Sequence, residues 1–270
     1  MNRFWRPDWS FVRYDDTLSI LDVLSSRTLD YKLAGLLWVL MEQRASLIVA
    51  SGPVYAGKTT LLHSLLDFLP PGIEQYSLQG FSEDFRFVAD HKPQATYLVS
   101  EEISNHQYEY LWGHQVQKTF KLLPQGYRFG ATIHARDVRE VAYVLHGYLD
   151  VPLHLIARLD VVVTLQARQG RRYDDDIIRR IDTVSLIGMD GDNLIAQTLA
   201  ARESLDGAFE YPSEQALQAA LAAKFGCPCE NVFAEMTARA GVLQKLHESG
   251  PHPREEVQRT IARFYRSRSR

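Results

Sequence analysis

The stretch that decides the fold is Ser46-Leu-Ile-Val-Ala-Ser51, followed directly by Gly52-Pro-Val-Tyr-Ala-Gly57-Lys58-Thr59. Its first part is a short apolar run with β-branched residues, which is typical of a buried parallel strand. Its second part matches the phosphate-loop pattern G-x-x-x-x-G-K-[ST] in full. Leucines at helical spacing follow as far as Pro70-Pro71-Gly72. A strand, a glycine loop and a helix in this order predict a binding site for a nucleoside triphosphate.

Each residue type in this loop has a predicted task. The two glycines allow backbone conformations and a close approach to phosphate that a Cβ would prevent. Backbone N–H groups and the start of the next helix then face the anion. Lys58 would reach the β- and γ-phosphates, and the Thr59 hydroxyl would coordinate Mg²⁺. The residues expected to bind ATP are Gly52, Pro53, Val54, Tyr55, Ala56, Gly57, Lys58, Thr59 and Thr60. The competing interpretation, a glycine turn with a surface lysine, does not explain the strand before the loop or the helix after it.

Further candidates stand at the ends of two other apolar runs. Glu101 and Glu102 follow Thr96-Tyr-Leu-Val-Ser100, and His134 follows the run that starts at Tyr127. Ligands in open α/β sheets bind at the carboxyl ends of the strands, so all three are candidates for the site. A carboxylate there can hold Mg²⁺ or polarise the attacking water. The residues themselves leave open which glutamate acts, and two solvated carboxylates are the alternative.

The rest of the chain alternates between strand-like and helix-like segments. Strands alternating with helices imply a mostly parallel sheet with helices on both faces. We therefore expect an α/β P-loop NTPase (RecA-like) core over residues 17–200, after an N-terminal segment 1–16 and before a small helical region 201–270. The expected helices cover residues 17–43, 59–69, 106–123, 138–149 and the chain from 213 onward. The expected strands cover 46–51, 96–100, 127–134 and 160–165, with a β pair over 175–198.

Composition sets limits on the function. The chain has 270 residues and a net charge of -3, which gives no general basic field for nucleic acid. Its two cysteines, Cys227 and Cys229, provide neither a disulfide framework nor a complete zinc site. The most apolar run, Leu33 to Met41, is far shorter than the roughly 20 residues of a membrane-spanning helix. No secretory signal is recognisable at the start. We expect a cytoplasmic protein that could lie at the inner membrane through a partner.

Taken together, the motifs resemble those of the secretion-superfamily motor ATPases. These enzymes serve type II and type IV secretion, type IV and Tad pili, and archaeal flagella. The resemblance covers nearly the whole chain, and its His box is the more specific motif. The segments that carry it are Phe11-Val-Arg13, Thr17-Leu-Ser-Ile-Leu-Asp-Val-Leu24, the P-loop, Gly126-Tyr127, Ala131-Thr-Ile-His134-Ala135, Asp160-Val-Val-Val163, Gly170-Arg-Arg-Tyr173 and Ala238-Arg239.

The resemblance implies roles for particular residues. His134 would sense the γ-phosphate, Glu102 would be the catalytic Walker B glutamate and a Mg²⁺ ligand, and Glu101 is its neighbour. Glu83 in Ser82-Glu-Asp-Phe85 is similar to the family's Asp box, and Arg13 would contact the nucleotide. Glu101-Glu102-Ile-Ser-Asn105 departs from the family, because its glycine, arginine and second acid are replaced. The family's large N-terminal domain also has no counterpart before Phe11.

The resemblance further implies a homo-oligomer, a hexameric ring, that works with an inner-membrane platform or with secretion or pilus components. Our leading hypothesis is a motor or accessory ATPase of such a machine. A nucleotide-binding regulatory or scaffold subunit with little turnover is the second hypothesis, and a DNA-handling P-loop ATPase is the third. Arg86 and Arg128 are positional candidates for an arginine donated to a neighbouring subunit, with surface ion pairs as the alternative.

Overall fold

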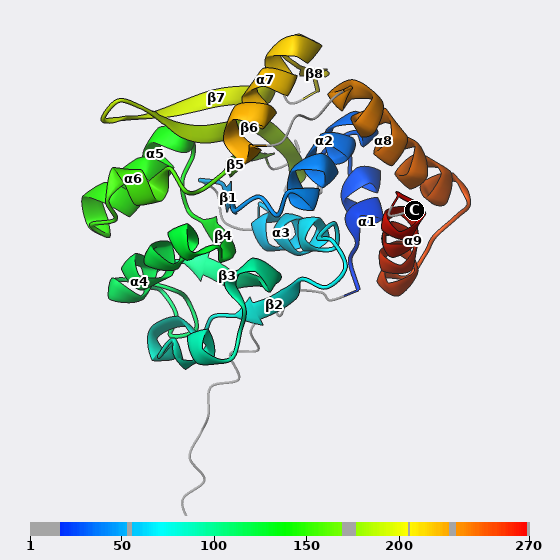
Figure 1. Ribbon diagram of the computed structural model, residues 1–270. Coiled ribbons are helices and arrows are strands. Elements are labelled where there is room, and N and C mark those ends of the chain that lie inside the picture. The colour runs from blue at the N-terminus through cyan, green and yellow to red at the C-terminus, as the bar shows by residue number, and fades with distance from the viewer. Residues whose placement is uncertain (1–16, 53–55, 169–176, 205, 227–230, 269–270) are drawn as a thin grey trace, which may run out of the picture.

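A mixed β-sheet of eight strands runs through the described part of the protein, in the order β2-β3-β4-β1-β5-β6-β7-β8 (Figure 1). The computed structural model describes residues 17–52, 56–168, 177–204, 206–226 and 231–268. The strands are β1 Leu47–Ala50, β2 Glu74–Ser77, β3 Thr96–Ile103, β4 Arg128–Ile133, β5 Val161–Arg168, β6 Ile178–Asp190, β7 Asn193–Arg202 and β8 Phe209–Glu210.

The first five strands in chain order form a parallel half of the sheet, and β1 lies inside it between β4 and β5. Leu47 pairs with Gly130 on one side and with Val161 on the other. The strands β6, β7 and β8 extend the sheet in antiparallel fashion beyond β5. The expected α/β fold with a mostly parallel sheet is therefore confirmed, and the turn of the expected β pair lies between Asp190 and Asn193.

Helices cover both faces of this sheet, because alternate strand residues point to opposite sides. In β1, Leu47 and Val49 enter one hydrophobic cluster, while Ile48 and Ala50 enter the other. Figure 1 shows α4, α5 and α6 on one side, and α1, α2, α8 and α9 on the other. The helices are α1 Ile20–Ser25, α2 Tyr31–Glu42, α3 Lys58–Leu66, α4 His114–Leu122, α5 Val138–Tyr143, α6 Leu153–Ile156, α7 Glu214–Phe225, α8 Val232–Glu248 and α9 Arg254–Arg268.

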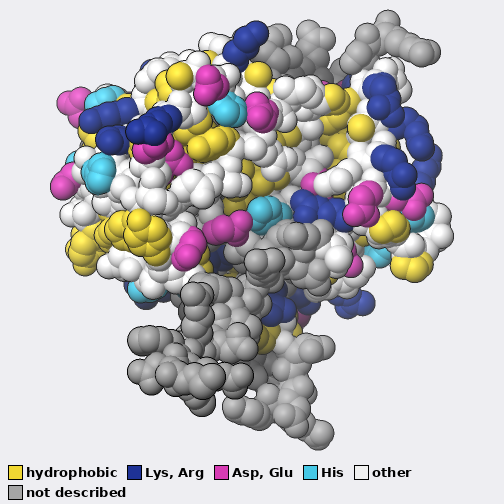
Figure 2. All heavy atoms as spheres, turned by 90° about the horizontal axis from the view of Figure 1, so that it is seen from below, with side chains coloured by type: hydrophobic (Ala, Val, Ile, Leu, Met, Phe, Trp, Pro, Cys, Tyr) yellow, Lys and Arg dark blue, Asp and Glu magenta, His cyan; other side chains and the backbone are white. Residues whose placement is uncertain are grey.

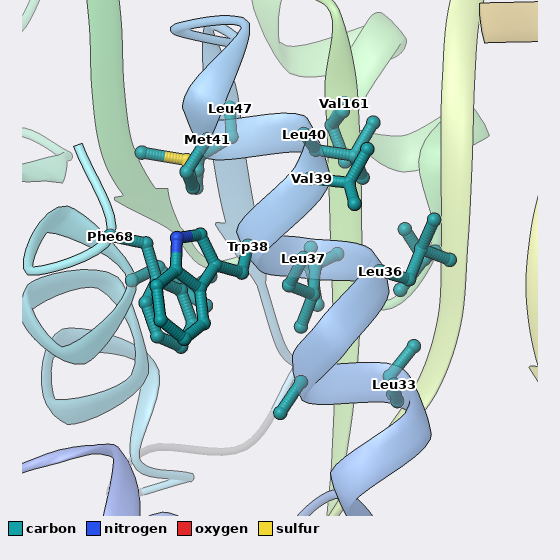
Figure 3. Packing of buried hydrophobic residues seen from close by; sticks show 14 of the residues in the cluster. Leu33, Leu36, Leu37, Trp38, Val39, Leu40, Met41, Leu47, Phe68 and Val161 are labelled. Atoms are coloured by element: carbon teal, nitrogen blue, oxygen red, sulfur yellow. The ribbon is translucent and has the colours of Figure 1, made fainter. Parts of the chain in front are cut away.

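The C-terminal helices pack into the same core as the helices that begin the chain. Trp38 of α2 stacks on Phe68 with ring centroids 4.9 Å apart (Figure 3). The Trp38 Nε1–H donates to the Tyr265 hydroxyl at 3.0 Å, and that hydroxyl donates to the Phe68 carbonyl at 2.6 Å. Arg254 at the start of α9 pairs with Asp67 at 2.8 Å. The region after β8 thus contacts α2 and the end of α3 directly, through hydrogen bonds and an ion pair.

Three expected elements differ from the structure. The helix expected over 17–43 is two helices, because Asp30 caps a new one by accepting from the Leu33 N–H at 2.7 Å. The helix expected over 106–123 begins only at His114, since Leu111 still bonds back to the Glu102 carbonyl at 3.0 Å. The helix expected over 138–149 continues from α5 as a π-helix over Val144–Tyr148. The strands β2 and β8 were not expected, because neither has a clear apolar period.

No helix in the described ranges combines the length and the apolar character that crossing a bilayer requires.

Candidate functional site

The phosphate loop lies at the carboxyl end of β1. Ser51 follows this strand, and its N–H donates to the Ile133 carbonyl of β4 at 3.3 Å. Gly57 has a left-handed backbone with φ of 82° and caps the start of α3. A side chain is strained in that conformation, which gives a physical reason for glycine at this position. Pro53, Val54 and Tyr55 lie outside the described residues.

The start of α3 has the properties of an anion site. Gly57 provides no side-chain acceptor for the first N–H groups of the helix, which have no partner within the helix. These groups also carry the positive end of the helix dipole. Among the described residues, the buried Ser51 hydroxyl oxygen has no hydrogen-bond partner either. These donors fit a bound phosphate chain, and Lys58, Thr59 and Thr60 form the first turn below it.

Lys58 is buried at this edge of the sheet, and its charge faces the ends of two strands. Its Nζ lies 3.5 Å from both ring nitrogens of His134. Burial lowers the pKa of Lys58, and the nearby Glu102 carboxylate opposes that shift. Phosphate oxygens are the kind of group that would stabilise the charged form of a lysine held in this way.

Glu102 and His134 meet at the ends of the neighbouring strands β3 and β4. The Glu102 Oε1 lies 3.3 Å from the His134 Nε2. The pairing of β3 with β4 shifts register between Ser100 and Ile103, so a bulge holds the two glutamates. Glu102 is nearly buried, whereas Glu101 is exposed and pairs with His63 of α3 at 2.8 Å. Of the two glutamates, Glu102 is therefore the one that the structure brings to Lys58 and His134.

Protein groups alone do not complete a metal site here. In the described ranges, no three His, Cys, Asp or Glu side chains gather in a way that could hold a metal ion. Magnesium commonly uses one or two protein oxygens together with substrate phosphates and water. The sequence names the Thr59 hydroxyl and Glu102 as the protein oxygens for such an ion, and this assignment stays a prediction.

The remaining expected residues lie elsewhere. The Glu83 carboxylate accepts the N–H groups of Gln79 at 2.9 Å and Phe85 at 2.8 Å, so it stabilises the loop after the edge strand β2. Arg86 is exposed and pairs with Asp84 at 3.2 Å. Arg128 starts β4 at the opposite edge from the P-loop, and lies 3.5 Å from the buried Asp160. Arg13 lies outside the described residues.

Two arginines beside the P-loop were not anticipated. A Cβ built on Gly52 would lie 2.6 Å from the Arg136 Cγ, and one built on Gly57 would lie 3.0 Å from the Arg179 Cδ. Arg136 stands two residues after His134, so its closeness to the site could have been inferred from the sequence. No local sequence pattern places Arg179 at the loop, because its position there depends on where β6 lies in the sheet.

The strand order and the helices on both faces define this chain as an α/β protein with a mostly parallel sheet, and the P-loop motif follows β1 at its carboxyl end. No protein-family model matches the chain. Among curated proteins it is similar to the Uncharacterized protein MJ1287 of Methanocaldococcus jannaschii. The two are 23% identical over 268 residues, which cover 88% of this chain and 95% of that protein.

Three solved structures are also similar to the chain. The VirB11 ATPase of the Brucella suis type IV secretion system in complex with sulphate has a TM-score of 0.41 and is 17% identical over 66% of this chain. The pilus retraction motor PilT with bound ADP has a TM-score of 0.40 and is 13% identical over 60% of this chain. The Legionella pneumophila ATPase DotB has a TM-score of 0.38 and is 11% identical over 90% of this chain. The similarity spans 59%, 54% and 64% of those chains, which is less than two thirds of each.

Proposed function

We propose that this chain binds ATP with Mg²⁺ at the P-loop and hydrolyses it. The observation that supports this most directly is the meeting of Lys58, His134 and Glu102 at the carboxyl ends of β1, β4 and β3. Lys58 lies 3.5 Å from both His134 nitrogens, and Glu102 lies 3.3 Å from His134 Nε2. A buried lysine, a carboxylate and a histidine at one sheet edge provide charge, a base and a hydrogen-bond sensor at the same place.

The residues have distinct tasks in this proposal. Bound ATP and Mg²⁺ would supply the phosphoryl group to be transferred and the divalent charge that stabilises it. Lys58 and the first N–H groups of α3 bind phosphate oxygens, and Thr59 holds the ion. Glu102 orients the attacking water and accepts its proton. His134 contacts both Lys58 and Glu102, so it can detect whether a terminal phosphate is present.

The finer proposal is a motor or accessory ATPase of a type II or type IV secretion system or of a pilus-like machine. Its support is the order of the sequence motifs, from Thr17 through the P-loop and Glu102 to His134. We propose a homo-oligomer, as a hexameric ring, that acts at an inner-membrane platform. The face drawn in Figure 2 carries both acidic and basic side chains, with several Lys and Arg side chains together along its right edge. The net charge of -3 is in keeping with a partner other than nucleic acid.

One observation favours a second candidate, a nucleotide-binding regulatory or scaffold subunit. The segment Glu101-Glu102-Ile-Ser-Asn105 lacks the glycine, the arginine and the second acid of the motor family. Such a subunit would use the same P-loop contacts to bind ATP, but it would release little phosphate.

Calorimetric titration with ATP–Mg²⁺, together with a phosphate-release assay, tests the proposal. Lys58→Ala should weaken ATP binding by about 10- to 100-fold, as expected when a charged hydrogen-bond donor is lost, and should abolish turnover. Lys121→Ala is the matched control, because Lys121 is an exposed residue of α4. Tight binding without phosphate release would favour the scaffold, and undiminished binding by Lys58→Ala would refute the P-loop assignment.

The oligomeric part of the proposal has its own test. Light scattering should give the mass of a hexamer when a non-hydrolysable ATP analogue is present. A monomer with and without the analogue would contradict an autonomous motor. DNA-stimulated turnover that weakens with salt would instead support the third hypothesis.

A further inference from the structure

Arg179 reaches the P-loop from a distant part of the chain. It is the second residue of β6, which runs antiparallel to β5, and it pairs there with Ala167. Because of this direction, the start of β6 lies at the same edge of the sheet as the carboxyl ends of β1 and β5. Arg179 therefore lies near the proposed nucleotide site, although it follows all of the parallel strands in the sequence.

The side chain of Arg179 lies against the last glycine of the loop. A Cβ built on Gly57 would be 3.0 Å from the Arg179 Cδ and 3.6 Å from its Nε. Gly57 itself caps the helix whose first N–H groups form the anion site. The Arg179 Nε therefore lies close to the start of this helix, and the Arg179 Nη1 donates to the Ile177 carbonyl at 3.4 Å.

The charge of the nucleotide provides a reason for a second cation at this site. Lys58 is the cation of the loop itself, and it already faces the Glu102 carboxylate. A polyphosphate carries several negative charges, so one lysine beside a carboxylate neutralises only part of them. A guanidinium is always charged and presents two parallel N–H groups, which suit phosphate oxygens.

The other arginine beside the loop, Arg136, is more exposed to solvent than Arg179. The Arg136 Nε donates to the Glu140 carboxylate at 3.1 Å, and its backbone N–H donates to the same carboxylate at 2.6 Å. Its side chain is 80% exposed. The contact of Arg136 with Gly52 is made by its Cγ, which is an apolar part of the side chain.

We propose that Arg179 binds the phosphates of the nucleotide from within the same chain, so that the site contains a second cation without a neighbouring subunit. This inference rests on the proposed function, because it requires nucleotide at the P-loop. The competing role for Arg179 is packing alone, in which its methylene stem supports Gly57 and its charge is dispensable.

Arg179→Met separates these roles, because methionine keeps an unbranched stem and removes the charge. Arg180→Met is the matched control. Arg180 is the next residue, its side chain points to the other side of the strand, and its Nη1 donates to the Ser26 carbonyl at 3.0 Å. Thermal unfolding of each full-length variant establishes that it is folded, and Arg179→Lys, which keeps a positive charge, provides a second variant.

Titration with ATP–Mg²⁺ and ADP–Mg²⁺ at two salt concentrations gives the readout. Arg179→Met should weaken both nucleotides by about 10- to 100-fold, and its affinity should depend less on salt than that of the native protein. Arg180→Met should stay within about threefold of native, and Arg179→Lys should fall between the native protein and Arg179→Met.

Equal affinities of Arg179→Met and Arg180→Met would overturn the inference. If Lys58→Ala still lost binding in that case, the proposed function would stand while Arg179 would be a packing residue. Absence of nucleotide binding by the native protein would overturn both proposals.

Discussion

Gly35 lies in the middle of α2, at the point where this helix packs against α8. It is buried, and a Cβ built on it would lie 2.2 Å from the Met236 carbonyl oxygen. The next atoms, the carbonyl carbon and the Cα of Met236, would be 3.0 and 3.1 Å away. All three are backbone atoms, so α8 cannot make room for a methyl group by turning a side chain. Gly35→Ala must push the two helices apart.

Two opposing effects set the magnitude. Alanine is better than glycine in a helix interior by about 1 kcal/mol. Overpacking of a filled core typically costs about 1–3 kcal/mol, and a clash between backbones belongs at the upper end of that range. The expected net loss is therefore about 2 kcal/mol, which lowers Tm by roughly 4–8 °C in a protein of this size class.

Gly241 of α8 is the matched control, because the same substitution meets a different surrounding. It also lies inside a helix, and a Cβ built on it would have no atom within 4 Å. Gly241→Ala should therefore stabilise the protein by about 0.5–1 kcal/mol through helix propensity and reduced freedom of the unfolded chain.

Urea unfolding followed by far-UV circular dichroism measures both variants against the native protein. The midpoint should fall for Gly35→Ala and rise for Gly241→Ala, with unchanged slopes. A native-like or raised midpoint for Gly35→Ala would refute the close crossing of α2 and α8.

Three further outcomes follow from the structure. In urea titrations, Glu42→Gln should lower the unfolding free energy by about 2 kcal/mol, because the buried Arg239 then pairs with one carboxylate fewer. The double variant with Arg239→Met should regain most of that free energy, because no buried charge is then left without its partner. Burial raises the pKa of the Tyr265 hydroxyl, so above pH 10 the native state keeps this proton while the unfolded chain loses it. The free energy of unfolding therefore falls as pH rises above 10. Tyr265→Phe should reduce the slope of the unfolding free energy against pH by up to about 1.4 kcal/mol per pH unit. Glu102→Gln should slow phosphate release by about 100-fold or more while ATP still binds, whereas Glu101→Gln should change the rate by no more than about threefold.

The parts of the fold that were predicted from the sequence are those fixed by local patterns. The run from Ser46 to Ser51 is buried, and the glycine at position 57 has a left-handed backbone, which the loop motif provides for by having glycine there. His134 was placed correctly at the end of its strand, because parallel strands end at one edge of the sheet.

The parts that were missed depend on contacts between distant segments. The helix expected from His106 onward does not begin there, because the Leu111 N–H donates to the Glu102 carbonyl at the end of β3. Arg179 comes near Gly57 only because an antiparallel strand follows β5. Neither feature can be recognised in the local sequence, because both depend on how distant segments pair in the sheet.

The choice between Glu101 and Glu102 shows why the chemistry is harder to predict than the fold. Adjacent strand residues point to opposite faces, so a pair of glutamates at a strand end always offers one candidate on each side. A bulge between Ser100 and Ile103 then re-aims both, and no sequence rule locates such a bulge. Geometry decides instead, because Glu102 is nearly buried beside His134 while Glu101 pairs with His63 on the outside. A motif can therefore place carboxylates at the end of a strand, but only the packing around them determines which one lies beside His134.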